Sequence, residues 1–204
     1  TYALACDEHG QRGIISPMEA QIFPTTKGKG KIEVYGGVAP SIVESAKIAR
    51  SFFRRYNSNV MNYDIDLHLV HPSEGGPSQA SGPSAGLAIT MAMLSALTSM
   101  PIKPRICMTG KIELAGGKAG AVGGIQPKRG AGKLDVAREE KFKIVIIPKV
   151  CYDDLVKTFP DYLKTSRDQG CEIVAGNDVW EYAAYLFDAT KEELIKKLMN
   201  LGKE

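Results

Sequence analysis

Residues 82–98 read GPSAGLAITMAMLSALT, and this stretch does most to predict the fold. A serine, Ser84, follows a rigid Gly-Pro step. From Ser84 to Thr98 the run is rich in Ala, Leu, Ile and Met and holds no charged residue. Such a run predicts a helix that is buried on nearly all sides. The other elements of the chain are therefore expected to pack around it.

The place of Ser84 at a helix start has chemical consequences. Backbone N–H groups at a helix start are unpaired and lie at the positive end of the helix dipole. They could hold the oxyanion of an attacked carbonyl group, and the small residues Ala85 and Gly86 would let a peptide approach closely. The alternative is that Ser84 is only an N-cap, since serine is favoured there. The pentapeptide alone does not separate the two interpretations.

Before this stretch, alternation of apolar and polar residues predicts strands, and turn signals separate the first of them. The first two strands are expected to be antiparallel. Ala39-Pro40-Ser41 opens a helix that runs to about Arg55. A loop rich in Gly, Pro and Ser occupies residues 72–83. The predicted strands are residues 2–6, 13–23, 31–35 and 64–70.

After the central helix, the pattern changes between short strands and helices. A glycine-rich turn lies in residues 116–124. The predicted strands are residues 105–109, 111–114, 143–147 and 171–174, and the predicted helices include 133–142 and 189–201. We expect one α+β domain over residues 1–204, or one with residues 149–204 set apart as a small helical subdomain.

Composition excludes several classes of protein. The chain has 204 residues and a formal net charge of only +3, without the strongly basic stripe of a nucleic-acid-binding protein. Lys27, Lys29 and Lys31 are spaced by glycines, as in a solvated turn. No apolar run approaches the ~20 residues of a membrane span, and we expect no signal peptide. Because the chain begins at Thr1 without a methionine, we expect a fragment of a longer protein.

The four cysteines point to a reducing compartment. Cys6, Cys107, Cys151 and Cys171 are far apart and show no C-x-x-C spacing, so neither zinc nor another metal is expected. We expect them to be reduced and mostly buried in a cytoplasmic protein. Cys151 and Cys171 could meet in space, which the sequence does not show.

A serine nucleophile needs a base, and the histidines do not supply a clear one. A Ser-His-Asp triad requires a histidine, and the chain has His9, His68 and His71. His9 lies in a Glu-His-Gly turn and is expected in solvent. His68 alternates with leucines on a predicted strand, which His71 ends. Either could lie near Ser84, but a strand histidine with its own partners is the preferred interpretation.

A lysine can also act as the base if burial lowers its pKa toward neutrality. Such a lysine is expected in glycine-rich and otherwise apolar surroundings. Residues 120–128, GAVGGIQPK, provide these surroundings.

Several motifs follow one another along the chain. They are GKGK (28–31), YGG (35–37), SA (45–46), DLHL (66–69), GPSAG (82–86), MTG (108–110) with Ile112 and Leu114, VGGI (122–125) and KIVIIP (143–148). In this order they resemble the proteolytic domain of the Lon (S16) protease family nearly end to end. Because the motifs are separate and in the right order, the resemblance is specific.

The resemblance implies roles for particular residues. Ser84 would be the nucleophile, and Thr109 would hydrogen-bond the catalytic lysine and orient it. Without the resemblance, Thr109 would be taken as an ordinary strand threonine. Two departures from the family pattern concern gating by the substrate loop and the response to pH. Ser81 stands where the family usually has an acidic residue, and the loop 73–80 is longer than usual.

Two lysines compete for the role of base, because the resemblance places the base a few residues beyond a Gly-Gly pair at a helix start. Counting forward from Gly123-Gly124 selects Lys128, and counting back from the 143–148 strand selects Lys133. We favour Lys128, since the glycine turn would fix the chain beside Ser84, and keep Lys133 as the alternative. The lysine that is not the base is expected in solvent.

The resemblance further implies a fold like the second domain of ribosomal protein S5 and assembly into a homo-hexameric ring. It implies a Ser-Lys peptidase for unfolded or damaged polypeptides. Lon enzymes carry an ATP-driven AAA+ unfolding module on the same chain. Residues 27–31 lack the spacing of a phosphate-binding loop, so ATP and Mg²⁺ are not expected as cofactors of this chain. It would be an excised protease part or a relative without the motor.

Two other functions are compatible with these residues. One is a non-catalytic Lon-like module for assembly or partner binding, against which the retention of Ser84, Thr109 and a lysine argues. The other is an esterase or amidase for small molecules.

Overall fold

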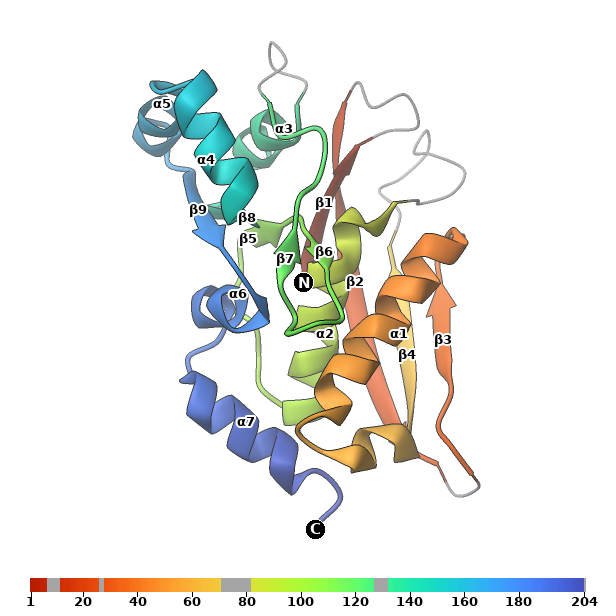
Figure 1. The fold of residues 1–204 in the computed structure, drawn as a ribbon. Helices are drawn as coiled ribbons and strands as arrows, with labels where there is room; N and C mark the ends of the chain where they lie inside the picture. Colours follow the sequence, from red (N-terminus) through yellow and green to blue (C-terminus); the bar gives the residue numbers. More distant parts are fainter. Residues whose placement is uncertain (7–11, 26–27, 71–81, 127–131, 204) are drawn as a thin grey trace.

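The computed structural model describes residues 1–6, 12–25, 28–70, 82–126 and 132–203. Within these residues, seven strands form one mixed sheet in the order β3-β4-β2-β1-β5-β8-β9, and two short strands, β6 and β7, form a separate hairpin. Helices pack on the sheet (Figure 1). The predicted α+β class is confirmed. The likeness to ribosomal protein S5 stays a prediction.

The first half of the sheet is mainly antiparallel, as the alternating patterns predicted. β1 (Tyr2–Cys6) pairs with β2 (Gly13–Pro24), and β2 pairs with β4 (Tyr63–Leu69), both antiparallel. β3 (Ile32–Tyr35) lies parallel to β4, and α1 (Pro40–Arg54) with the 3₁₀ turn η1 (Ser58–Asn62) connects the two. A parallel pair needs such a crossover.

The second half of the sheet is parallel. β5 (Ile106–Met108) lies between β1 and β8 (Ile144–Pro148), and β9 (Glu172–Gly176) forms the edge beside β8. Each predicted strand exists, but the patterns did not predict this parallel pairing. The remaining elements are β6 (Lys111–Ile112), β7 (Ala119–Gly120), α3 (Lys133–Glu139), α4 (Lys149–Thr158), α5 (Tyr162–Asp168), α6 (Val179–Leu186) and α7 (Lys191–Asn200).

The helix α2 (Gly86–Thr98) occupies the main core, as its uncharged sequence predicted. It contacts β2 on the sheet and the helices α1, α6 and α7. Its buried threonines satisfy their hydroxyl groups within the helix: Thr90 Oγ1 donates to Gly86 O at 2.7 Å, and Thr98 Oγ1 to Leu94 O at 2.7 Å. The α-helix begins two residues later than predicted, because Ser84 lies in a 3₁₀ turn, η2 (Pro83–Ala85).

Alternation along the central strands divides the core into two clusters. On β8, Ile146 faces the main core around α2, while Val145 and Ile147 face a second cluster. This second cluster includes Leu134 of α3 and Leu155 of α4. Successive side chains of a strand point to opposite faces, so this half of the sheet carries helices on both faces.

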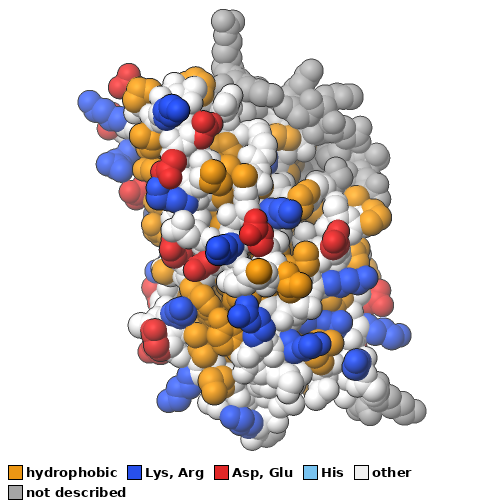
Figure 2. Space-filling view, in the orientation of Figure 1, with side chains coloured by type: hydrophobic (Ala, Val, Ile, Leu, Met, Phe, Trp, Pro, Cys, Tyr) orange, Lys and Arg blue, Asp and Glu red, His pale blue; other side chains and the backbone are white. Residues whose placement is uncertain are grey.

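The chain after Pro148 shares the same sheet and core. β9 extends the sheet, and Tyr182 of α6 and Leu194 of α7 belong to the main core. Whether residues 149–204 form a subdomain stays a prediction. In the part of the chain that the structure describes, no helix is long and apolar enough to cross a membrane. Figure 2 shows basic, acidic and apolar side chains interspersed over one face of the molecule.

Candidate active site

The turn that carries Ser84 is tied to the segment that follows β5. Ser84 O accepts a hydrogen bond from Gly110 N at 2.8 Å and another from Thr109 Oγ1 at 3.3 Å. Leu87 N in turn donates to Gly110 O at 2.9 Å. Ser84 itself is half-buried. The backbone on both sides of this serine is therefore fixed by the Thr109–Gly110 segment.

The glycine of the pentapeptide serves packing rather than access to a substrate. A Cβ atom on Gly86 would lie 3.0 Å from Ile112 N and 3.1 Å from Ile112 Cγ2. Gly86 thus faces β6 inside the protein, and the expectation that it lets a peptide approach is wrong. Glycine stands here because the helix α2 begins directly against the β6 backbone.

The N–H groups of Gly86 and Leu87 are also not free for an oxyanion. Gly86 N donates to Pro83 O within the 3₁₀ turn, and Leu87 N is bound to Gly110 O. The expectation of unpaired N–H groups does not hold for these two residues, since a 3₁₀ turn and a neighbouring segment supply acceptors. Other N–H groups around Ser84 would have to bind an oxyanion.

Lys133 brings an amine to the same place. It is the first residue of α3, only 3% of it is exposed, and its Nζ donates to Thr109 Oγ1 at 3.3 Å. Thr109 is fully buried. A chain of hydrogen bonds thus runs from Lys133 Nζ through the Thr109 hydroxyl to the carbonyl oxygen of Ser84. The threonine can orient the amine because its own hydrogen is directed at Ser84 O.

Burial lowers the pKa of Lys133 from its ordinary value of 10.5, and the nearby Cys6 and Cys151 thiols oppose this shift. A buried ammonium loses hydration, which favours the neutral amine. In the residues that the structure describes, no carboxylate is among the causes of this shift. The amine is therefore suited to accept a proton.

Two glycines make room for the lysine. A Cβ atom on Gly13 would lie 2.7 Å from Lys133 Cα, and one on Gly124 would lie 3.4 Å from Lys133 Cε. Gly124 also has a positive φ of 75°, which favours glycine. The start of β2 and the 122–124 segment therefore enclose Lys133 from two sides.

These groups share one pocket of about 860 Å³. Ser84 and Pro83 form one part of its wall, and the segment 121–126 forms another. Its further lining residues are Cys6, Lys133, Val150, Cys151, Asp154 and Leu155. A cavity of this size can take several residues of an extended peptide, since ligand pockets span about 300–1,000 Å³.

A family model described as the Lon protease (S16) C-terminal proteolytic domain matches residues 4–179. The chain belongs to this family. Its relatives include an archaeal Lon protease of Pyrococcus abyssi, 30% identical over 192 residues and 92% of this chain, but 18% of that protein. A Lon protease of Halothermothrix orenii is 33% identical over 81% of this chain and 21% of that protein. A Lon protease of Clostridioides difficile is 38% identical over 70% of this chain and 17% of that protein. The chain spans about a fifth of the length of these relatives.

Among the site residues that the sequence predicted, this Lon-type domain brings Ser84, Thr109 and Lys133 together. Lys128, the lysine that sequence analysis favoured, lies outside the described residues, so its place stays a prediction. The expectation that Lys133 would then lie in solvent is wrong. The sequence predicted a helix that begins at Lys133, but not that its first side chain would be buried in the protein.

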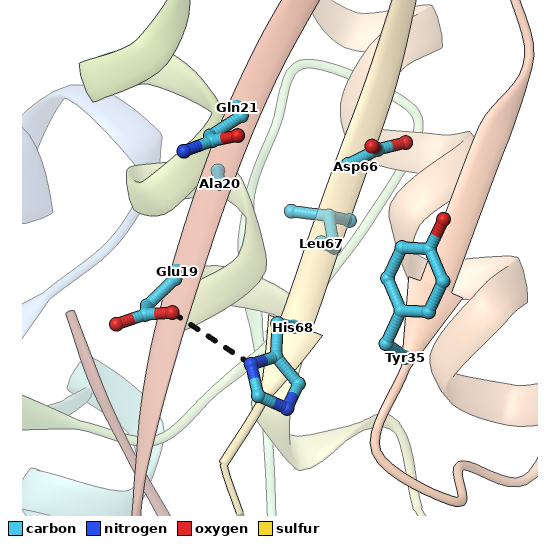
Figure 3. Close-up of a pocket in the computed structure, with 7 residues that line it drawn as sticks. All are labelled: Glu19, Ala20, Gln21, Tyr35, Asp66, Leu67 and His68. Carbon is cyan, nitrogen blue, oxygen red and sulfur yellow. Dashed lines mark ion pairs between the residues drawn. The ribbon is translucent and has the colours of Figure 1, made fainter.

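His68 lies elsewhere in the Lon-type domain. Its Nδ1 is 3.7 Å from Glu19 Oε2, and both side chains line a different hollow of about 430 Å³ on the open face of β2, β4 and β3 (Figure 3). Tyr35 of β3 lies beside them. His68 is thus a strand histidine with its own partner, as preferred from the sequence. His9 and His71 lie outside the described residues.

Sequence reasoning missed the residues that hold α3. Asp135 is buried, and its carboxylate accepts from Gly132 N at 3.2 Å, from Arg138 Nη2 at 3.0 Å and from Tyr162 Oη at 2.6 Å. Burial and this hydrogen bond to Asp135 raise the pKa of Tyr162. An aspartate at the third helical position is a common capping signal, but nothing in the sequence links it to a tyrosine of α5.

Two of the cysteines were also not recognised as site residues. The cysteines were expected to be mostly buried; Cys107 and Cys171 are buried, while Cys6 and Cys151 are half-buried and line the pocket. All four are free thiols, Cys151 and Cys171 included. Among the described residues, no group of His, Cys, Asp and Glu is arranged to hold a metal ion.

Proposed function

We propose that this domain is a serine endopeptidase in which Ser84 is the nucleophile and Lys133 is its general base. The observation that carries the proposal is the buried Lys133 amine, bound to Thr109 Oγ1, in the pocket that Ser84 lines. Membership in a family of proteolytic domains supports peptide-bond hydrolysis. The burial of Lys133 and its hydrogen bond to Thr109 support it as the base, in place of Lys128, which the sequence analysis had preferred.

The lowered pKa of Lys133 matters because an ordinary lysine is a poor base. With a pKa near 10.4, only about one lysine side chain in a thousand is neutral at pH 7.5. Burial of Lys133 lowers its pKa and so raises that fraction. The hydrogen bond to Thr109 Oγ1 then holds the amine in one orientation. The side chain therefore loses little conformational entropy when the transition state forms.

The reaction proceeds in two steps. The neutral Lys133 amine accepts the proton of Ser84 Oγ as this oxygen attacks the peptide carbonyl, and backbone N–H groups near Ser84 other than those of Gly86 and Leu87 stabilise the oxyanion. The ammonium then protonates the leaving amine. A water molecule, deprotonated by the same amine, hydrolyses the acyl-enzyme and restores Ser84.

The proposal extends to the setting of this domain. Its substrates are unfolded or damaged polypeptides, and it acts in the cytoplasm in a homo-hexameric ring. An ATP-dependent unfolding module supplies those chains. The greater length of the relatives, of which the chain matches about a fifth, supports a further module beside the proteolytic domain.

Single substitutions test the assignment in the protein with a fluorogenic peptide and unfolded casein. We expect Ser84→Ala to lower kcat by about 10⁴-fold or more, and Lys133→Met by about 10³-fold, because members of a catalytic pair act as a unit. Ser51→Ala, on the exposed face of α1, and Lys128→Met serve as matched controls that retain activity.

The outcomes separate the competing functions. Loss of activity in Lys128→Met with retention in Lys133→Met would assign the base to Lys128 instead. A wild-type protein that cleaves neither substrate and whose Ser84 is not labelled by an active-site phosphonate would be a non-catalytic Lon-like module. Much faster hydrolysis of small esters than of casein would indicate an esterase.

A further inference from the structure

Two thiols lie in the wall of the proposed active-site pocket. Cys6 ends β1 and Cys151 lies in the first turn of α4, and both are half-buried lining residues. The other two cysteines, Cys107 and Cys171, are 0% and 2% exposed. The structure therefore sorts the four thiols into two that a small molecule in the pocket can reach and two that it cannot.

Both pocket thiols touch the segment that covers Lys133. Cys151 Sγ accepts from Val122 N at 3.5 Å and donates to Val122 O at 3.6 Å. A Cβ atom on Gly124 would lie 2.6 Å from Cys6 Sγ and 3.4 Å from Lys133 Cε. Cys6 and the lysine stem thus pack against the same glycine, while Cys151 is bound two residues earlier in the same segment.

The thiols and the amine also interact electrostatically. The charges of Cys6 and Cys151 both raise the pKa of Lys133, against the larger effect of burial. A thiol beside a basic amine is the setting in which cysteine becomes a nucleophile.

We propose that Cys6 and Cys151 form a modification site for small disulfides such as oxidised glutathione, with Lys133 as the proton acceptor. The thiol proton passes to Lys133 Nζ, and the thiolate attacks one sulfur of the disulfide. A new S–S bond forms to the cysteine, the disulfide S–S bond breaks, and the leaving thiolate takes the proton from Lys133. One disulfide and one thiol thus become a mixed disulfide and a free thiol.

The attached group occupies the pocket that the peptide would need. Cys6 and Cys151 share this pocket with Ser84 and Lys133. The adduct therefore excludes the peptide substrate and prevents Lys133 from accepting the proton of Ser84 Oγ. Reduction by a dithiol restores the site. The effect on cleavage rests on the proposed peptidase function, but formation of the adduct does not.

The test uses reduced protein incubated with oxidised glutathione, followed by intact mass and by peptide mapping without reduction. We expect glutathione on Cys6, on Cys151 or on both, and none on Cys107 or Cys171, which serve as internal controls. The Cys6→Ser, Cys151→Ser double variant should form no adduct. In Lys133→Met, adduct formation should be about tenfold slower, because the thiolate is the attacking form and the variant lacks the amine that takes the thiol proton.

Peptide cleavage by each protein is compared before and after treatment. Wild-type activity should fall in proportion to adduct and return with dithiothreitol, while the double variant should keep the activity that it had before treatment. Adduct on neither pocket cysteine, adduct only on Cys107 or Cys171, an unchanged rate in Lys133→Met, or unchanged cleavage by fully modified wild-type protein would overturn the proposal.

The Ser84→Ala variant separates this proposal from the peptidase assignment. It should form the adduct at the wild-type rate, since the serine takes no part in the exchange. Adduct formation in a protein that cleaves no peptide would support the thiol site and refute the peptidase. Peptide cleavage by a wild-type protein whose Cys6 and Cys151 stay unmodified would support the peptidase assignment and refute the thiol site.

Discussion

At the level of single residues, the proposed reaction depends on the buried amine of Lys133. Ser84 and Thr109 could be predicted because each lies in a short, continuous motif, although Thr109 was predicted only through the resemblance to Lon proteases. The sequence alone could not decide between Lys128 and Lys133, since both follow the same glycine turn and the choice depends on which side chain the fold directs toward Thr109 and the pocket. Only the fold shows that Gly13 and Gly124 leave space for the Lys133 side chain.

The lowered pKa of Lys133 predicts how stability depends on pH. In the window between the lowered pKa and the ordinary value of 10.5, the unfolded state binds more protons than the folded state. Stability contributed by this site therefore rises with pH through that window, by at most about 1.4 kcal/mol per pH unit.

Urea unfolding of the wild type and of Lys133→Met at a series of pH values measures this dependence. The difference in unfolding free energy between wild type and variant should shift in favour of the wild type as pH rises toward 10.5. A difference that stays constant, or shifts the other way, would show that the amine is charged in the folded protein.

At the scale of the element, α3 is the part that places the base. Gly132 N, Arg138 and Tyr162 all donate to the Asp135 carboxylate, so the first turn of α3 is fastened to α5. The sequence predicted a helix that begins at Lys133, yet not this fastening, because Tyr162 is far along the chain. Similarly, the predicted strands were found, but the parallel order of β5, β8 and β9 depends on pairings that no local pattern records.

Removing the Asp135 carboxylate should loosen α3. We expect Asp135→Ala to destabilise the protein by about 3 kcal/mol, because it leaves Arg138 and the Tyr162 hydroxyl without this buried partner. Tyr162→Phe removes one hydrogen bond and should cost about 1 kcal/mol.

Chemical denaturation measures the unfolding free energy of both variants. Peptidase kinetics, measured under conditions in which the variants are fully folded, show whether Lys133 has moved. Asp135→Ala should lower kcat more than it changes KM. Equal stability of Asp135→Ala and Tyr162→Phe would show that the carboxylate holds the helix through the tyrosine alone.

At the scale of the whole molecule, the two halves of the sheet are covered differently. The parallel half carries helices on both faces. Among the described residues, β3, β4 and the part of β2 that pairs with β4 expose the Glu19–His68 pair on one face. The site lies on the parallel half, where β1, α3 and α4 bring Cys6, Lys133 and Cys151 around one pocket. Composition predicted a globular domain but not this arrangement, because it follows from long-range strand pairing.

An NMR titration of the lysine side chains can measure the lowered pKa of Lys133. The wild-type protein should show one lysine that titrates clearly below 10.5; its signal should persist in Lys128→Met and disappear in Lys133→Met. If all lysines titrate near their ordinary value, or if the low-titrating signal survives in Lys133→Met, the lowered pKa of Lys133 is contradicted.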